Sequence, residues 1–169
     1  LTVDTVVAGN RERDHRWGFT TPPKLTLKSL MSFASHPKWA LNYLTHEKFQ
    51  LANVSHWTKK GSSIAKGVME YINEQYDPAM SWKDAEYVVK RWGGPFALKG
   101  VMSVEDAKRA VEIGASAIML SNHGGRQLDG SRSPFDQLPA IADAVGGKIE
   151  IILDGGVRRG THVLKALSL

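Results

Sequence analysis

The chain has 169 residues, of which 42% are hydrophobic, and its formal net charge is +5. This length and composition fit one globular domain, because domains cluster at about 100–200 residues. The absence of cysteine excludes disulfide bonds and thiolate metal sites, and no apolar run approaches the roughly 18 residues that a membrane-spanning helix needs.

Both ends of the sequence look interrupted. The N-terminal LTVDTVVAGN lacks the basic and then apolar plan of a signal peptide, and it begins abruptly as a strand pattern. The C-terminal THVLKALSL stops inside an apolar helical pattern. We therefore expect the chain to be a piece of a longer domain.

The hydrophobic pattern predicts short strands that alternate with helices. In chain order, the strands are expected at residues 1–7, 95–99, 117–121 and 149–153. The helices are expected at residues 81–92, 103–114, 134–145 and 161–169. Such alternation indicates an α/β fold, with a parallel sheet and helical crossovers.

Residues 20–66 form a long segment that interrupts this order. It contains seven lysines and one acidic residue, so its charge is +6 while the rest of the chain sums to −1. Pro22, Pro23, Pro37 and Gly61 break its pattern, so we interpret it as an irregular, variable basic loop inserted after the first strand. Its charge indicates an anionic partner.

A polar or charged residue stands at the end of each predicted strand, at Asp4, Lys99, Ser121 and Asp154. In barrels and in doubly wound sheets, ligands bind at the carboxyl ends of parallel strands. Chemistry at four successive strand ends favours a TIM (β/α)8 barrel. No G-x-G-x-x-G motif follows a strand, which argues against a dinucleotide-binding sheet.

The stretch SNHGGRQLDG, at residues 121–130, carries the most chemical information. His123 follows a buried strand on a glycine turn, and Arg126 places a guanidinium three residues later. A proton acceptor beside a group that binds carboxylates is what proton abstraction from a 2-hydroxy acid requires. From the residues alone, a structural loop with a capping histidine is an equal alternative.

Three further residues become interesting through their positions. Asp4 could orient the imidazole of His123, although an aspartate that caps a turn is the simpler interpretation. Lys99 could stabilise negative charge on a cofactor, or it could extend along the surface. Arg11 lies in a charged stretch a few residues beyond the first strand.

The sequence ILDGGVRRG, at residues 152–160, predicts an anion site. Asp154 ends a strand, Gly155 and Gly156 follow, and Arg158 precedes a helix. Backbone N–H groups at such a turn bind phosphate, which is a recurrent feature of the late loops of barrels.

Taken together, LTVDT, GNRERD, LKG, SNHGGRQLDG and LDGGVRRG resemble, in order and spacing, the family of FMN-dependent L-2-hydroxy-acid dehydrogenases and oxidases. The resemblance implies that His123 is the catalytic base and Asp4 its carboxylate partner. It also implies that Arg11 and Arg126 bind the substrate carboxylate. The implied reaction oxidises an L-2-hydroxy acid, such as L-lactate or mandelate, to the 2-oxo acid.

The same resemblance implies an FMN cofactor and no metal. Its flavin-binding residues would be Thr2, Lys99, Ser121, Asp154, Gly155, Gly156 and Arg158. The four strands would be the fourth to seventh of the barrel. Because the family's N-terminal half, with its active-site tyrosines, is missing here, an inactive half-barrel fragment is the alternative. A different barrel enzyme that binds a phosphorylated ligand is a less favoured alternative.

The resemblance also suggests partners. The electron acceptor would be a quinone or oxygen, and the full-length protein would be a homo-oligomer, as a tetramer. Residues 20–66 resemble an interfacial membrane anchor, with a basic lid over the active site as the alternative. We therefore expect a cytoplasmic protein that associates peripherally with the inner face of a bacterial membrane. Nucleic-acid binding is not expected, because no recognisable module accompanies the lysines.

Overall fold

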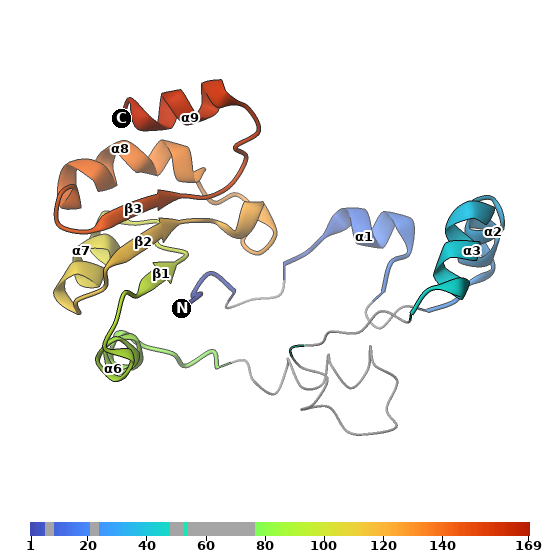
Figure 1. Cartoon of the computed structure of the whole chain (residues 1–169), viewed down its shortest axis with the longest axis horizontal. Coiled ribbons are helices and arrows are strands. Elements are labelled where there is room, and N and C mark those ends of the chain that lie inside the picture. The colour runs from blue at the N-terminus through green and yellow to red at the C-terminus, as the bar shows by residue number, and fades with distance from the viewer. Residues whose placement is uncertain (6–8, 21–23, 48–52, 54–76) are drawn as a thin grey trace. The chain divides into compact units, whose positions relative to one another are not determined.

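The computed structural model describes residues 1–5, 9–20, 24–47, 53 and 77–169. The chain divides into two compact units (Figure 1). One unit comprises Leu1–Arg11 and Pro78–Leu169, and the other comprises Glu12–Asp77.

The first unit contains a parallel sheet in the order β1-β2-β3. Its strands are β1 (Ala97–Lys99), β2 (Ala117–Leu120) and β3 (Glu150–Leu153). Parallel pairing aligns Lys99 with Met119, and Met119 with Ile152. Neighbouring strands thus follow one another in the sequence, as in a barrel. This order confirms the predicted parallel α/β architecture.

The first predicted strand, at residues 1–7, is only partly present. Thr2 forms an isolated parallel bridge with Lys99, and the backbone bends at Asp4. The amide of Lys99 donates to the carbonyl of Leu1 at 2.8 Å, and the amide of Val3 donates to the carbonyl of Lys99 at 2.9 Å. Residues 1–3 therefore extend the sheet beside β1, while residues 6–8 lie outside the described part of the chain.

Helices precede β1 and follow each strand, as predicted. They are α6 (Trp82–Trp92), α7 (Val104–Glu112), α8 (Pro134–Val145) and α9 (Gly160–Leu167). The hydroxyl of Ser103 accepts a hydrogen bond from the amide of Asp106 at 3.0 Å, which satisfies a free donor in the first turn of α7. At the start of α8, the hydroxyl of Ser133 accepts a hydrogen bond from the amide of Asp136 in the same way.

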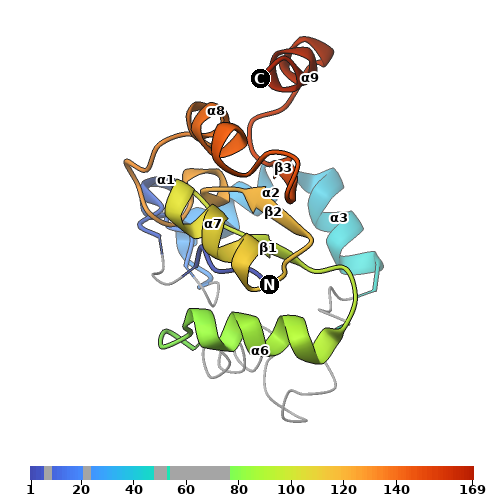
Figure 2. The same cartoon turned by 90° about the vertical axis from the view of Figure 1, so that its left-hand side faces the viewer.

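The core lies between the sheet and these helices. Leu98, Ile118 and Leu120 of the strands are buried together with Ile141 and Val145 of α8. Helices α7 and α8 contact each other and the sheet, and Figures 1 and 2 show α8 beside β3 from two directions. Because this core anchors all three strands, it sets the positions of the side chains at their carboxyl ends.

The second unit shows that residues 20–66 are not wholly irregular. It contains α1 (Glu12–Trp17), α2 (Leu27–Ala34) and α3 (Pro37–Thr45). Two of these helices fall inside the segment that we predicted as a loop. That prediction was wrong for residues 27–45, because Pro37 stands in the first turn of α3, where no backbone donor is needed. Most of residues 48–66 lie outside the described part.

An aromatic stack joins α2 to α3. The rings of Phe33 and Trp39 have centroids 5.3 Å apart, and those of Trp39 and Tyr43 are 5.4 Å apart. Thr26 and Ser29 form a capping box at the start of α2. In the part of the chain that the structure describes, no helix combines the length and apolar character needed to cross a bilayer.

Shortening Ile118, which is fully buried in β2, tests whether this core stabilises the fold. We expect Ile118→Ala to lower the free energy of unfolding by about 2–5 kcal/mol and Ile118→Val by about 0.5–1.5 kcal/mol. Urea unfolding of both variants measures these values. Equal, small effects of the two substitutions would contradict the assignment of Ile118 to a tightly packed core.

Candidate functional site

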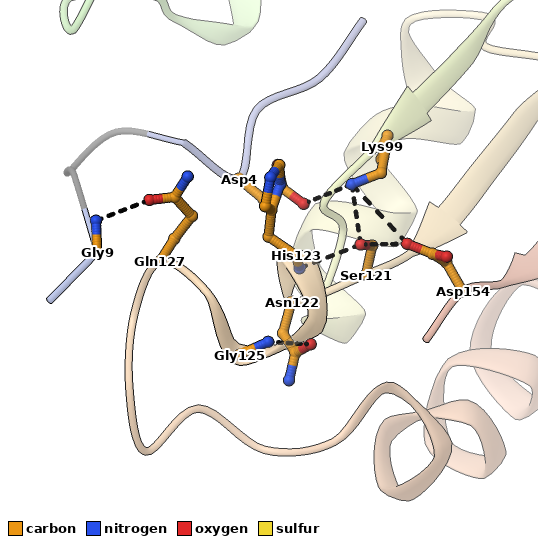
Figure 3. A network of polar contacts seen from close by, with 9 residues as sticks. All are labelled: Asp4, Gly9, Lys99, Ser121, Asn122, His123, Gly125, Gln127 and Asp154. Atoms are coloured by element: carbon orange, nitrogen blue, oxygen red, sulfur yellow. Dashed lines mark hydrogen bonds and ion pairs between the residues drawn. The ribbon is translucent and has the colours of Figure 1, made fainter. Parts of the chain in front are cut away.

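The side chains at the strand ends meet in one cluster (Figure 3). Asp4 follows the Thr2 bridge, Lys99 is the last residue of β1, Ser121 follows β2, and Asp154 follows β3. They converge because the carboxyl ends of parallel strands share one edge of the sheet. His123 joins the cluster from the loop after β2.

The ammonium group of Lys99 connects three of these residues. Its Nζ lies 2.8 Å from Oδ2 of Asp4, 3.0 Å from the hydroxyl of Ser121 and 3.9 Å from Oδ2 of Asp154. The Asp4 side chain is only 7% exposed, whereas that of Asp154 is 43% exposed. The ion pair with Asp4 is therefore the better shielded from solvent, and so the stronger of the two.

His123 contacts the other oxygen of the Asp4 carboxylate. Its Nδ1 lies 3.0 Å from Oδ1 of Asp4. With Asp4 ionised, Nδ1 carries the proton and donates it in this hydrogen bond, so Nε2 of the neutral ring has a free lone pair. The His123 side chain is 31% exposed, which lets a small molecule approach Nε2.

The backbone of His123 is held in an unusual conformation. Its φ angle is 57°, in the left-handed region that non-glycine residues seldom adopt. Its amide donates to the hydroxyl of Ser121 at 3.2 Å, and its carbonyl accepts from the amide of Arg126 at 3.2 Å. The side chain of Asn122 closes the short helical turn η1 (His123–Gly125) by accepting from the amide of Gly125. These contacts aim the imidazole toward Asp4.

Ser121 links the lysine, the histidine and Asp154. Its hydroxyl is buried, donates to Oδ2 of Asp154 at 2.7 Å, and accepts from both Lys99 and the amide of His123. The resemblance had implied only a cofactor contact for this serine. Its linking role was missed, because the signal consists of contacts between different strand ends that sequence spacing does not encode.

Two opposing effects act on the carboxyl group of Asp4. Burial raises its pKa, but the hydrogen bonds and positive charges of Lys99 and His123 together outweigh burial and hold the pKa below its ordinary value. Asp4 is therefore ionised at neutral pH. An ionised Asp4 is what keeps the Nδ1 proton of His123 in place.

The remaining predicted residues take no part in the side-chain hydrogen bonds and ion pairs of this cluster among the described residues. The exposed side chains of Arg11 and Arg126 form no ion pair with another described residue, so both remain available for an anion. Gly155 and Gly156 have φ angles of 103° and 70°, and nothing lies within 4 Å of an added Cβ at either position. Arg158 is exposed on the same loop. Glycine is thus required for the backbone conformation, and the space above the loop is open.

The lowered pKa of Asp4 predicts a pH dependence of stability. A carboxyl with a lowered folded pKa contributes stability that is complete above its ordinary value of 3.8 and is lost as the pH falls through the folded pKa. We expect the stability difference between wild type and Asp4→Asn to be constant from pH 7 to about 5 and to shrink below about 4. Urea unfolding across this range measures it. A difference that grows at low pH would contradict the ion pair.

Comparison with known proteins gives a consistent result. The family of FMN-dependent dehydrogenases matches residues 1–169. An L-lactate dehydrogenase of Yersinia pestis is 43% identical over 170 residues, which are 100% of this chain and 44% of that protein. An L-lactate dehydrogenase of Yersinia pseudotuberculosis has the same identity and coverage. The chain therefore spans less than half the length of these relatives.

Solved structures agree with this assignment. The crystal structure of a monotopic membrane protein, (S)-mandelate dehydrogenase, superposes with a TM-score of 0.88 and 34% identity, over 99% of this chain and 43% of that chain. A lactate oxidase of Pediococcus acidilactici superposes with a TM-score of 0.65 and 31% identity, over 99% and 36%. The sequence match along the whole chain and these structural likenesses show that the chain belongs to the family of FMN-dependent dehydrogenases.

Proposed function

We propose that the full-length protein oxidises an L-2-hydroxy acid, such as L-lactate or mandelate, to the 2-oxo acid with the help of FMN. The observation that carries this proposal is the pairing of His123 with Asp4 at 3.0 Å, at the carboxyl edge of a parallel sheet. The lactate and mandelate enzymes among the relatives support this substrate class. We also propose that residues 1–3 and β1 to β3 belong to the fourth to seventh strands of a (β/α)8 barrel.

His123 acts as the base in this proposal. Its Nε2 takes a proton from the substrate, because Nδ1 is already protonated and bound to Asp4. The imidazolium that forms then lies beside an ionised carboxylate, which stabilises the positive charge. Asp4 therefore orients the ring and faces the charge that forms on it.

Arg126 and Arg11 would bind the substrate carboxylate. A guanidinium presents parallel N–H donors that match the two oxygens of a carboxylate. Arg126 lies three residues from His123 in the same loop, so a carboxylate bound to it would bring the neighbouring carbon toward the base. Both guanidinium groups are exposed and unpaired among the described residues, which suits a site that a small anion must enter.

The residues around Lys99 fit an FMN group. Lys99 supplies positive charge, Asp154 can accept hydrogen bonds from hydroxyl groups, and the open backbone at Gly155 and Gly156 leaves room for a phosphate near Arg158. Thr2 pairs with Lys99 at the end of β1, and Ser121 directly follows β2. Bound FMN would supply the two-electron acceptor, which no amino-acid side chain provides.

A quinone or oxygen would then accept the electrons, and the full-length protein would be a homo-oligomer, as a tetramer. The alternative is that this chain by itself is an inactive half-barrel fragment, because an incomplete flavin site would not support oxidation of the substrate. Comparing the chain with the full-length protein separates the two.

We further propose that α2 and α3 contact the surface of a bacterial membrane from the cytoplasmic side. These helices expose apolar side chains, including Leu27 at 75% and Leu44 at 79%. Lys24 precedes α2, Lys28 lies in α2 and Lys38 lies in α3. No acidic residue occurs between residues 24 and 46. Exposed apolar groups beside unopposed lysines suit an anionic lipid interface. The monotopic membrane neighbour supports this proposal.

Anaerobic flavin reduction tests the catalytic proposal. We expect the full-length protein with bound FMN to lose its flavin absorbance on addition of L-lactate or L-mandelate. His123→Asn should slow this reduction about 10²–10⁴-fold, because the proton acceptor is lost, while FMN fluorescence quenching shows that the cofactor still binds. His15→Asn, in α1, is the matched control and should behave as wild type. Normal reduction in His123→Asn would refute the proposed base.

Vesicle sedimentation tests the membrane proposal. Replacing Lys24, Lys28 and Lys38 by glutamate should weaken binding to vesicles that contain anionic phospholipid by roughly 100-fold or more, since each lysine contributes about 1 kcal/mol. The same change at Lys83, Lys108 and Lys148, which are exposed in the other unit, alters the net charge equally and serves as the control. Equal losses in the two triple variants would refute a specific role of α2 and α3.

A further inference from the structure

A hydrogen bond joins two segments that lie far apart in the sequence. The amide of Gly9 donates to Oε1 of Gln127 at 2.9 Å, across 118 positions of the chain (Figure 3). Gly9 belongs to the stretch that leads to Arg11, and Gln127 follows Arg126 in the loop after β2. The bond therefore connects the two segments that carry the candidate carboxylate-binding arginines.

The two backbones are in close contact at this point. A Cβ atom added to Gly9 would lie 1.8 Å from the carbonyl oxygen of Arg126 and 2.9 Å from Cα of Gln127. The φ of Gly9 lies outside the left-handed region, so its backbone conformation does not demand glycine. Glycine is needed here for space alone, because any side chain would push the segment away from Arg126.

This contact places Arg11 near Arg126. Two residues span at most about 7 Å of extended chain, so Cα of Arg11 lies within about 7 Å of Cα of Gly9. Gly9 in turn touches the backbone of Arg126. Both guanidinium groups can therefore reach one carboxylate, provided that the segment of Gly9 stays where Gln127 holds it.

The loop after β2 does not need Gln127 for its own conformation. Asn122 binds the amide of Gly125 and the carbonyl of Arg132, and the amide of Arg126 donates to the carbonyl of His123. Asp4 and Ser121 hold His123 separately. Loss of the Gln127 side chain would thus release the segment of Gly9 and Arg11 and leave the base in place.

We propose that Gln127 is a positioning residue for substrate binding: its side-chain oxygen fixes Gly9, and thereby brings Arg11 to the same carboxylate as Arg126. This inference rests on the proposed function. It assigns a role to a side chain whose hydrogen bond, among the described residues, is to Gly9 and not to His123 or the strand-end carboxylates.

The test uses the full-length protein with bound FMN and two substitutions of Gln127. Gln127→Met keeps the length of the side chain but removes the carbonyl acceptor, whereas Gln127→Glu retains an oxygen at that position. Gln137→Ala is the matched control, because Gln137 also bonds to a distant backbone group, donating to the carbonyl of Met102 at 2.7 Å. It lies in α8 and outside the proposed site.

Hydrogen exchange provides a measurement that does not depend on turnover. We expect the amide of Gly9 to exchange faster in Gln127→Met and at the wild-type rate in Gln127→Glu and Gln137→Ala. We also expect Gln127→Met to raise KM for the hydroxy acid and Kd for pyruvate about 10-fold, the loss expected for one hydrogen bond of about 1.4 kcal/mol. The kcat, its pH profile and FMN affinity should stay unchanged.

The possible failures are distinguishable. Unchanged exchange of Gly9 in Gln127→Met overturns the inference, because the bond would then not hold the segment. Faster exchange with unchanged KM and Kd also overturns it, and leaves the proposed function intact. If the wild-type protein is not reduced by any L-2-hydroxy acid, the proposed function fails and this inference falls with it, whatever the exchange rate of Gly9.

Discussion

The ion pair between Lys99 and Asp4 is the interaction on which the rest of the site depends. Asp4 accepts from Lys99 through Oδ2 and from His123 through Oδ1, so one carboxylate orients two functional groups without competition between them. Because the Asp4 side chain is almost buried, removal of Lys99 would leave a poorly solvated carboxylate, at a cost of about 3–5 kcal/mol. The sheet supports this pair by joining the backbone of Lys99 to that of residues 1–3.

Ser121 extends this constraint across the sheet. Its hydroxyl joins Lys99 to Asp154 and also holds the amide of His123, whose left-handed backbone is otherwise unfavourable. A substitution at one strand end would therefore remove a hydrogen bond from a residue at another strand end. Such coupling suits a site in which a base, a cation and a cofactor-binding carboxylate must keep fixed relative positions.

Much of the fold could be predicted from local patterns. Capping serines, apolar periodicity and glycine turns located α6 to α9 and the three paired strands within a few residues, because these signals act over one or two turns of chain. The prediction of an irregular loop was wrong at residues 27–45, since Pro37 begins a helix instead of ending one. Of the strand predicted at residues 1–7, the described residues 1–5 form one bridge at Thr2 and then bend at Asp4, which the β-branched pattern did not indicate.

The sequence by itself determined helices α6 to α9, the parallel order of β1 to β3 and the family, because each of these follows from short motifs and from spacing along the chain. It also identified His123 and Asp4 as chemically suitable residues. Only the tertiary structure decided that Asp4 serves two partners at once and that Ser121 links three strand ends. The contact of Gly9 with Gln127 was equally invisible, since its residues lie 118 positions apart. Hydrogen bonds of this kind depend on distances that only the packed sheet defines.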